Sequence, residues 1–592
     1  MKKNSIIFII VGLILIIWLA ILLAPFVNKG LFYIISEFSN IINNPFNITW
    51  CNDSLRTILV LVMIYMLLIA MYVFNDKNYR KGIEYGSAKW GNSKVINKKY
   101  LQLPIESNKI LTNNIQIGYN SKKHRRNLNT LVIGGSGAGK TRFYAKPNIM
   151  QCNTSFVILD PKGEILRSTA NLLLKKGYKL RILDLINMEK SDSYNPFVYL
   201  RSDNDVQRLV TNLFKATTPK DSKSSDPFWD MAASTLLLAL IFYLWYEAPF
   251  EEQNFSMVLE MLRAGEVRED DDDYKSPLDI LFDLLEERNP NHIALKYYRN
   301  YRSGSAKTLK SIQITLTSKL DKFNLDSLAT ITQYDEMELS KLGEEKTALF
   351  AIIPDSDPSF NFLVSILYTQ LFQQLFYIAD YKYGGSLPIH VHFVMDEFAN
   401  VSLPNDFEKI LSTMRSREVS VSIIIQNLAQ LKSLFTKEWE SIVGNCDELL
   451  YLGGNEQSTH KYISELLGKD TIDTNTYGKS KGKSGSYSTN YQKMGRELLT
   501  PDEVRTLDNN NAILFIRGER PIIDLKYILE KHPNIKYTTD GEGEPYSHEL
   551  KDYSLASINL FKDEGITETI DIKDIEEDYD IITSDDIDYY KF

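Results

Sequence analysis

Residues 134–141 read GGSGAGKT and match the phosphate-binding pattern G-x-x-x-x-G-K-[ST] in full. Residues 129–133, NTLVI, predict a short buried strand before this loop, and residues 142–150 predict the start of a helix after it. A glycine-rich loop in that setting turns backbone N–H groups toward phosphate oxygens, and the helix N-terminus adds partial positive charge. The sequence therefore predicts a nucleotide site formed by Gly134, Gly135, Ser136, Gly137, Ala138, Gly139, Lys140 and Thr141.

Two carboxylates farther along the chain complete the expected chemistry for ATP and Mg²⁺. In this motif the lysine, Lys140, reaches the β- and γ-phosphates, and the hydroxyl of Thr141 ligates Mg²⁺. The apolar segment 390–395, HVHFVM, predicts a strand that ends in Asp396 and Glu397. Asp396 is suited to hold the Mg²⁺ shell through water, and Glu397 to orient and deprotonate the attacking water. Carboxylates often end strands, so this assignment depends on the upstream loop.

Polar residues flank the next predicted strand, 419–425. Gln426 follows it and is expected to sense the γ-phosphate or the attacking water, although a hydrogen-bonded buried amide is the alternative. Arg415 and Arg417 precede it. Either arginine could act across a subunit boundary on the transferring phosphoryl group, or lie on a solvated helix end. We favour Arg415 for the catalytic role.

Strand and helix signals alternate around the loop, which is typical of a parallel α/β sheet. Strands are expected at 156–159, 180–183 and 347–353, whereas 203–345 shows helical periodicity with little strand signal. We therefore predict a RecA-like P-loop NTPase with a mostly parallel central sheet. Its parts are residues 81–202 and 346–535, separated by an all-α insertion at 203–345 and followed by an acidic tail at 536–592 that is predicted to be disordered.

The N-terminal residues 1–80 predict a membrane anchor. Residues 6–27 are apolar and uncharged, and residues 55–74 contain a second apolar run, so each can form a spanning helix. A cleaved signal peptide is the alternative for the first run, but its apolar stretch is too long. Lysines precede the first span and basic residues follow the second, which places both termini in the cytoplasm. A third apolar run, 231–246, is interpreted as a buried core helix rather than a span.

Charge is distributed unevenly along the 592 residues. Residues 540–592 hold 17 acidic side chains and four lysines, so they account for a net charge of −13, and the rest of the chain carries +4. A mildly basic body is compatible with a polyanionic partner. The three cysteines lie far apart and give no evidence for disulfides or a zinc site.

These elements together resemble the TraG/TraD-type coupling proteins of conjugative type IV DNA transfer. The resemblance covers about residues 1–530 and rests on the N-terminal hairpin, the phosphate loop and five further segments. Those segments are YGSAKWG at 85–91, DPKGE at 160–164 with YNPF at 194–197, MDEF at 395–398, QNLAQL at 426–431 and GRELLTPDEV at 495–504. The DPKGE and GSAKWG segments are far more discriminating than the phosphate loop.

The resemblance implies a hexameric, RecA-like ATPase ring at the cytoplasmic face of the cell membrane. It also implies that the all-α insertion receives relaxase–DNA substrates for a type IV secretion channel. No sequence-reading module is present, so DNA binding is expected to be backbone-directed and non-specific. The basic segment 122–126 and the segment 476–494, predicted to be a mobile loop, are candidate contacts, although a solvated turn is as good an explanation for the first.

Two other functions remain open from the sequence. A chromosomal DNA pump of the FtsK/SpoIIIE kind also joins membrane spans to a RecA-like ring, but nothing after residue 530 resembles the winged-helix module that such proteins carry. A membrane receptor for secreted proteins that binds nucleotide without acting as a motor is the third hypothesis. ATP hydrolysis, and its dependence on Lys140 and Glu397, separates the motor from the receptor.

Overall fold

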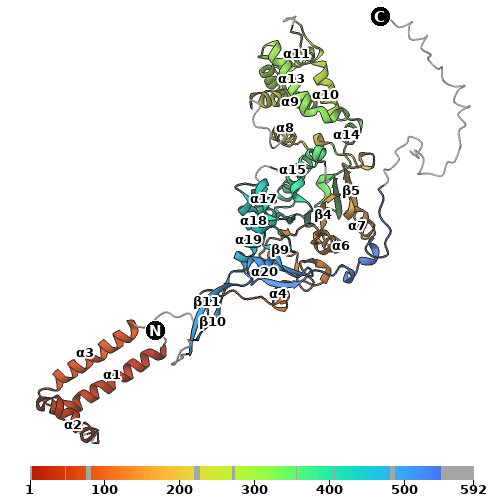
Figure 1. Ribbon diagram of the computed structural model, residues 1–592. Coiled ribbons are helices and arrows are strands. Elements are labelled where there is room, and N and C mark those ends of the chain that lie inside the picture. The colour runs from red at the N-terminus through yellow and green to blue at the C-terminus, as the bar shows by residue number, and fades with distance from the viewer. Residues whose placement is uncertain are drawn as a thin grey trace, which may run out of the picture. The chain divides into compact units, whose positions relative to one another are not determined.

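The computed structural model describes residues 3–43, 45–46, 48–74, 82–218, 227–269, 274–354, 357–401, 403–404, 407–479 and 487–548 (Figure 1). These residues form two compact units. The first contains the N-terminal residues as far as Ser87 together with Lys469–Arg496. The second contains Ala88–Gly468 and the described residues from Glu497 onward, and it holds the phosphate loop.

Two long apolar helices dominate the first unit. Helices α1 (Lys3–Leu23) and α3 (Ser54–Phe74) lie side by side, and the Tyr65 hydroxyl donates to the Ile9 carbonyl at 3.1 Å. The segment between them forms the short helices η1 (Ala24–Lys29) and α2 (Leu31–Ile42). Within the described residues, four segments are long and apolar enough to cross a membrane, and two of them, Ile9–Lys29 and Ser54–Met71, belong to this unit.

The segment expected to be a mobile loop at 476–494 is instead largely β-structure, so that prediction was wrong. Strands β10 (Lys469–Lys479) and β11 (Tyr487–Glu497) pair in a two-stranded sheet, while residues 480–486 lie outside the described residues. Tyr477 and Tyr491 are exposed, and none of the strand residues whose burial is described is buried, so these residues show no apolar alternation. The β-branched residues of TIDTNT at 471–476 are the sequence signal that was available.

The second unit is built on a nine-stranded sheet in the order β13-β12-β9-β3-β8-β7-β4-β6-β5. All pairs from β9 to β5 are parallel, and only β12 and β13 run antiparallel to their neighbours. The strands are β3 (Thr130–Ile133), β4 (Ser155–Pro161), β5 (Lys179–Asp184), β6 (Thr347–Ile353), β7 (Val391–Met395), β8 (Val419–Ile425), β9 (Glu448–Tyr451), β12 (Asn511–Ile516) and β13 (Ile522–Leu525). This arrangement confirms the mostly parallel α/β sheet.

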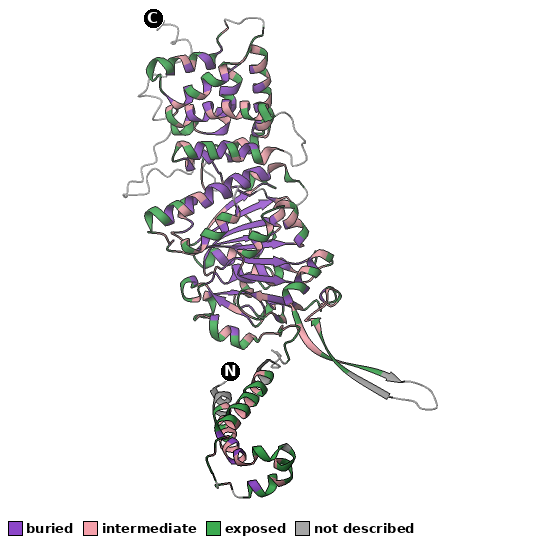
Figure 2. Cartoon of the chain, turned by 90° about the vertical axis from the view of Figure 1, so that its left-hand side faces the viewer, coloured by how far each residue is buried: buried purple, intermediate pink, exposed green. Residues whose placement is uncertain are grey.

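Both faces of the sheet are covered, as Figure 2 shows by the buried colour of its strands. One apolar cluster joins alternate strand residues such as Leu131 and Phe393 to helices that include α15 (Asn361–Tyr377) and α17 (Leu428–Leu434). The other joins residues such as Val132 to α4 (Ser93–Tyr100), α6 (Lys146–Met150) and α7 (Glu164–Lys175). Burial on both sides explains why strands such as β3 and β6 are nearly continuous apolar runs in the sequence.

Helices are the only regular secondary structure among the described residues of the segment 203–331. Helix α9 (Pro227–Glu247) lies at their centre: Leu236, Leu240 and Phe242 have no exposed surface, and the aromatic rings of Phe242 and Tyr297 stack at 5.5 Å. The apolar run at 231–246 thus has a packing explanation that needs no membrane. The other helices are α8 (Asp203–Thr217), α10 (Phe255–Ala264), α11 (Pro277–Arg288), α12 (Ile293–Arg302), α13 (Ala306–Leu320) and α14 (Asp326–Ile331).

The start of the predicted acidic tail is ordered against this unit. Asp540 pairs with Lys146 of α6 at 2.6 Å and accepts from Ser168 of α7 at 3.1 Å, and the Tyr546 N–H donates to the Arg167 carbonyl at 3.0 Å. Residues 536–548 therefore differ from the expected disorder, because they meet basic and polar side chains on two helices. Residues 549–592 lie outside the described residues.

Candidate nucleotide site

The phosphate loop joins β3 to the π-helical turn η3 (Thr141–Ala145), in the predicted strand–loop–helix order. Gly134 N–H donates to the Ile425 carbonyl at 3.1 Å and Gly135 N–H to the Gly453 carbonyl at 2.8 Å, which ties the loop to the neighbouring strands. Gly139 has φ +80°, and a Cβ there would lie 2.4 Å from the Phe143 ring. Only glycine meets both conditions at that position.

Thr141 and Asp396 come together at the end of the loop, although they are far apart in the sequence. The Thr141 hydroxyl donates to Asp396 Oδ2 at 2.5 Å. Asp396 is 5% exposed, and burial raises the pKa of its carboxyl. A hydroxyl and a carboxylate are hard oxygen ligands of the kind that Mg²⁺ prefers. When bound with ATP, Mg²⁺ would supply charge neutralisation for the β- and γ-phosphates; Thr141 would hold it directly and Asp396 through water.

The Glu397 carboxylate lies between the side chains of Lys140, in the phosphate loop, and Gln426, which follows β8. Its Oε1 is 3.8 Å from Lys140 Nζ, and the Gln426 side-chain amide donates to both of its carboxylate oxygens at 3.2 Å. The backbone of Glu397 has φ +53°, which is uncommon for a residue with a side chain. These contacts place the Glu397 carboxylate next to the side chains of Lys140 and Gln426.

Sequence reasoning assigned no role to Asp160, and the structure places it in the same site. Asp160, Asp396, Glu397 and Gln426 line one polar cavity of about 330 Å³. Asp160 is 1% exposed, and burial raises the pKa of its carboxyl to about 7. Its position in DPKGE, at the end of the apolar strand that follows the phosphate loop along the sequence, was the available signal. That signal was used only for the family resemblance.

The two candidate arginines lie away from this cavity. Gln426 follows β8, whereas both arginines precede this strand. A seven-residue strand is about 20 Å long, so the arginines and Gln426 lie at opposite ends of β8. Arg417 pairs with both carboxylate oxygens of Asp380, at 2.9 and 2.7 Å, whereas Arg415 donates to the Ser121 carbonyl at 3.2 Å. Neither arginine reaches the nucleotide site of its own chain, so any catalytic role requires a neighbouring subunit.

The basic segment 122–126 is partly structural. Arg126 is 6% exposed and donates to the Tyr100 hydroxyl at 2.8 Å, with its guanidinium 4.6 Å above the Tyr100 ring. This residue is therefore not available for DNA phosphates, while Lys122 and Lys123 are exposed on the short helix α5 (Ser121–His124).

Residues 89–541 match the family described as type IV secretory system conjugative DNA transfer. The chain belongs to this family. The match includes the phosphate loop, the Asp396–Glu397 pair and the all-α region, so the family assignment covers every residue of the candidate site.

Curated relatives and solved structures agree with the family. The chain is 24% identical over 405 residues to protein VirD4 of Agrobacterium fabrum, and 23% identical over 460 residues to a conjugal transfer protein TraG of Escherichia coli. These alignments cover 66% and 72% of this chain, and 57% and 72% of the relatives. The chain thus spans little more than half the length of the VirD4 relatives that it matches.

The bacterial conjugative coupling protein TrwB, lacking 70 N-terminal residues and unbound, has the same fold. It is 16% identical, with a TM-score of 0.55, and the alignment covers 77% of this chain and 97% of TrwB. TrwB has also been solved with the non-hydrolysable ATP analogue ADPNP and with ADP and Mg²⁺.

Proposed function

We propose that this chain is a membrane-anchored ATPase that couples a DNA substrate to a conjugative type IV secretion channel. The proposal rests on the geometry of the site. The Thr141 hydroxyl is hydrogen-bonded to Asp396, and Glu397 lies between Lys140 and Gln426. These are the groups that Mg²⁺–ATP binding and water activation need. The nucleotide complexes of TrwB support ATP and Mg²⁺ as the ligands.

The working form is a homo-hexameric ring at the cytoplasmic face of the membrane. Helices α1 and α3 form a two-span hairpin with both termini in the cytoplasm, because basic residues flank its inner ends. Arg415 of one subunit completes the site of the next, since it lies outside its own site. The all-α region receives the relaxase bound to DNA, and contact with DNA is made through its backbone.

The test is ATP hydrolysis by the full-length chain in lipid nanodiscs, with and without DNA. K140A removes phosphate contacts and is expected to abolish nucleotide binding. E397Q keeps binding and is expected to lower kcat by a factor of about 10² to 10⁴. K98A, on the exposed face of α4, is the matched lysine control and leaves both unchanged. Conjugation at the wild-type frequency with E397Q would refute the motor and favour a receptor for secreted proteins.

A further inference from the structure

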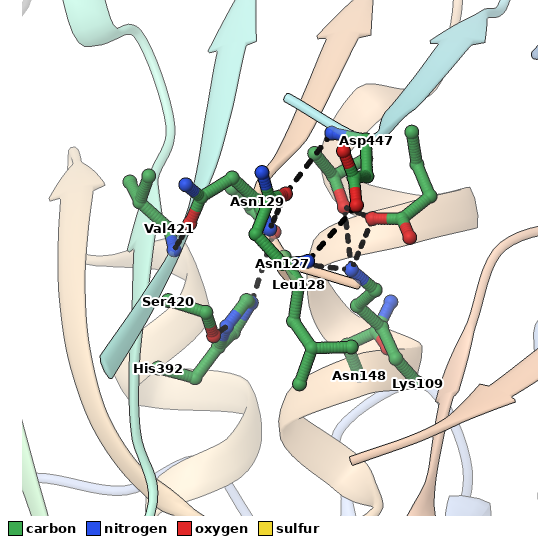
Figure 3. Close-up of polar contacts among 12 residues, drawn as sticks. Lys109, Asn127, Leu128, Asn129, Asn148, His392, Ser420, Val421 and Asp447 are labelled. Carbon is green, nitrogen blue, oxygen red and sulfur yellow. Dashed lines mark hydrogen bonds and ion pairs between the residues drawn. The ribbon is translucent and has the colours of Figure 1, made fainter. Parts of the chain in front are cut away.

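A chain of side-chain hydrogen bonds runs through the sheet from the edge that carries Arg415. It begins at Glu418, whose Oε2 lies 3.0 Å from His390 Nδ1. His390 Nε2 lies 2.7 Å from the Ser420 hydroxyl, and the same hydroxyl lies 2.6 Å from His392 Nδ1. Figure 3 shows His392 and Ser420 facing each other across β7 and β8.

The chain continues to the helix that follows the phosphate loop. His392 Nε2 lies 2.9 Å from the Ser422 hydroxyl, and that hydroxyl lies 2.7 Å from the hydroxyl of Tyr144. Tyr144 belongs to η3, the turn that begins at Thr141. We call these six residues the histidine–serine ladder: Glu418, His390, Ser420, His392, Ser422 and Tyr144.

The parallel register of two strands builds the middle of the ladder. His392 of β7 pairs with Ser420 of β8. Because side chains alternate across a strand, the HVH and SVS patterns at 390–392 and 420–422 place four polar groups on one face. That face lies under Tyr144. The ring of Tyr119 meets the ring of His390 edge-on at 5.0 Å, so Tyr119 packs against the His390 end of the ladder.

Stability alone does not explain these residues. His392, Ser420, Ser422 and Tyr144 have no exposed surface, and burying polar groups costs free energy that their hydrogen bonds only offset. Replacement of both partners of a buried hydrogen bond by apolar groups of the same shape can be nearly neutral or even stabilising. A fully connected polar network does, however, fix one arrangement of the elements that it joins.

The ladder also has a defined direction. Burial lowers the pKa of His390 and of His392, so both rings are neutral and each carries one N–H. The Glu418 carboxylate can only accept, so His390 donates to it and must accept from Ser420. Ser420 in turn accepts from His392, His392 accepts from Ser422, and Ser422 accepts from Tyr144. The acceptor that Glu418 supplies therefore orients every proton as far as Tyr144.

The outer end of the ladder meets the predicted trans-acting arginine. The Ser121 hydroxyl donates to Glu418 Oε1 at 3.4 Å, and the Ser121 carbonyl accepts from Arg415 at 3.2 Å. Glu418 and His390 also line a surface cavity of about 440 Å³ together with Lys122. A neighbour that binds at this edge meets Glu418 itself, and one that draws Arg415 away from Ser121 acts on Glu418 through Ser121.

We infer that the histidine–serine ladder couples the Arg415 edge of a subunit to the phosphate-loop helix of the same subunit. Glu418, His392 and Tyr144 are positioning residues: they hold η3, and with it Thr141, in the orientation that hydrolysis requires. The catalytic consequence rests on the proposed ATPase function. The physical coupling does not rest on that function, because it depends only on the hydrogen bonds that join the six residues.

A double-mutant cycle on the full-length protein tests the coupling. E418A removes the acceptor at one end, and Y144F removes the donor at the other. Each is expected to speed amide hydrogen exchange in residues 141–150 and to lower kcat for ATP at least about three-fold, with the Kd for ADP within two-fold. The double variant is expected to be no worse than the worse single variant, since distant residues are non-additive only when a network joins them.

The matched controls use the same chemistry outside the ladder. Tyr178 is a buried tyrosine like Tyr144, but its hydroxyl donates to the Thr154 carbonyl outside the ladder. Y178F combined with E418A is therefore expected to give the product of the single effects. E418Q keeps an acceptor for His390 and is expected to restore most of the activity lost in E418A. Wild-type exchange of residues 141–150 in E418A, or multiplicative effects of E418A and Y144F, would overturn the ladder. If the wild type hydrolyses no ATP, the proposed function fails, and the exchange result still decides the coupling.

Discussion

Asp160 and Asp396 occupy neighbouring positions at the carboxyl ends of two adjacent parallel strands. The register pairs Leu159 of β4 with Met395 of β7, so the two carboxylates follow side by side. Asp160 Oδ2 accepts from the Leu166 N–H at 2.7 Å, while its Oδ1 is buried and has no hydrogen-bond partner among the described residues. A buried acceptor beside Asp396 is suited to bind a water of the Mg²⁺ shell.

The first prediction concerns the role of Asp160 toward Mg²⁺. In D160N the amide oxygen can still accept from Leu166, so the fold should be kept. The Mg²⁺ concentration that half-saturates binding of a fluorescent ATP analogue is expected to rise about ten-fold, as for other outer ligands of metal sites. D184N is the control, since Asp184 also ends a strand and accepts backbone N–H groups, from Ile186 and Asn187. An unchanged Mg²⁺ requirement in D160N would remove Asp160 from the metal shell.

The second prediction separates the two arginines. R415A is expected to bind ATP normally and to lose most hydrolysis, by a factor of about 10³ or more, because in the proposed ring the Arg415 guanidinium acts on the neighbour's phosphate. R417A breaks the ion pair with Asp380 within its own chain. It should lower the thermal stability of the protein and leave the ATPase activity of the folded protein nearly unchanged. Mixing the R415A and K140A proteins tests action in trans. At some interfaces a K140A subunit then supplies Arg415 to the intact phosphate loop of an R415A subunit, so ATP hydrolysis should partly return. Two inactive variants that stay inactive when mixed would contradict the shared site.

A third prediction follows from the buried ion pair beneath the phosphate-loop strand, drawn in Figure 3 around Lys109. Lys109 Nζ lies 2.9 Å from Glu448 Oε2 and 2.7 Å from both the Leu128 carbonyl and the Thr130 hydroxyl, and neither charged side chain is exposed. K109M leaves the carboxylate buried without its partner, so the free energy of unfolding should fall by about 3 to 5 kcal/mol.

Replacing both partners of that pair should cost less than replacing one. K109M/E448L removes the uncompensated charge, and buried ion pairs often exchange for apolar pairs with little loss. The measurement is the denaturant concentration at the midpoint of unfolding for the wild type, K109M and K109M/E448L. K275M, which breaks the exposed pair with Asp283, is the control and should change the midpoint little. A double variant that is less stable than K109M would refute this account.

Much of this fold could be predicted because its signals are local. The strands at 347–353 and 419–425 were placed at their observed bounds. The first is an apolar run of the kind that marks a strand buried on both faces, and the second is rich in β-branched residues and lies between Arg417 and Gln426. The exposed strands β10 and β11 carry no such run. The histidine–serine ladder depends on strand register, which brings together residues 28 to 30 positions apart, as in His392 with Ser420 and Ser422. Single-sequence patterns do not give that register.

The last prediction concerns acid and the C-terminal segment that follows β13. His532 is 2% exposed, its Nδ1 accepts from the Asn534 N–H at 3.1 Å, and burial lowers its pKa to about 4. A histidine with a depressed pKa contributes stability that is present above pH 6.5 and is lost as the pH falls through about 4. The loss is at most about 3 kcal/mol. H532N keeps an acceptor for Asn534 and cannot be protonated, so its melting temperature should fall less than that of the wild type between pH 7 and pH 4.5. Amide exchange in residues 529–548 locates the effect. Equal pH dependence in the two proteins, with no faster exchange in the wild-type segment at low pH, would show that His532 does not control this segment.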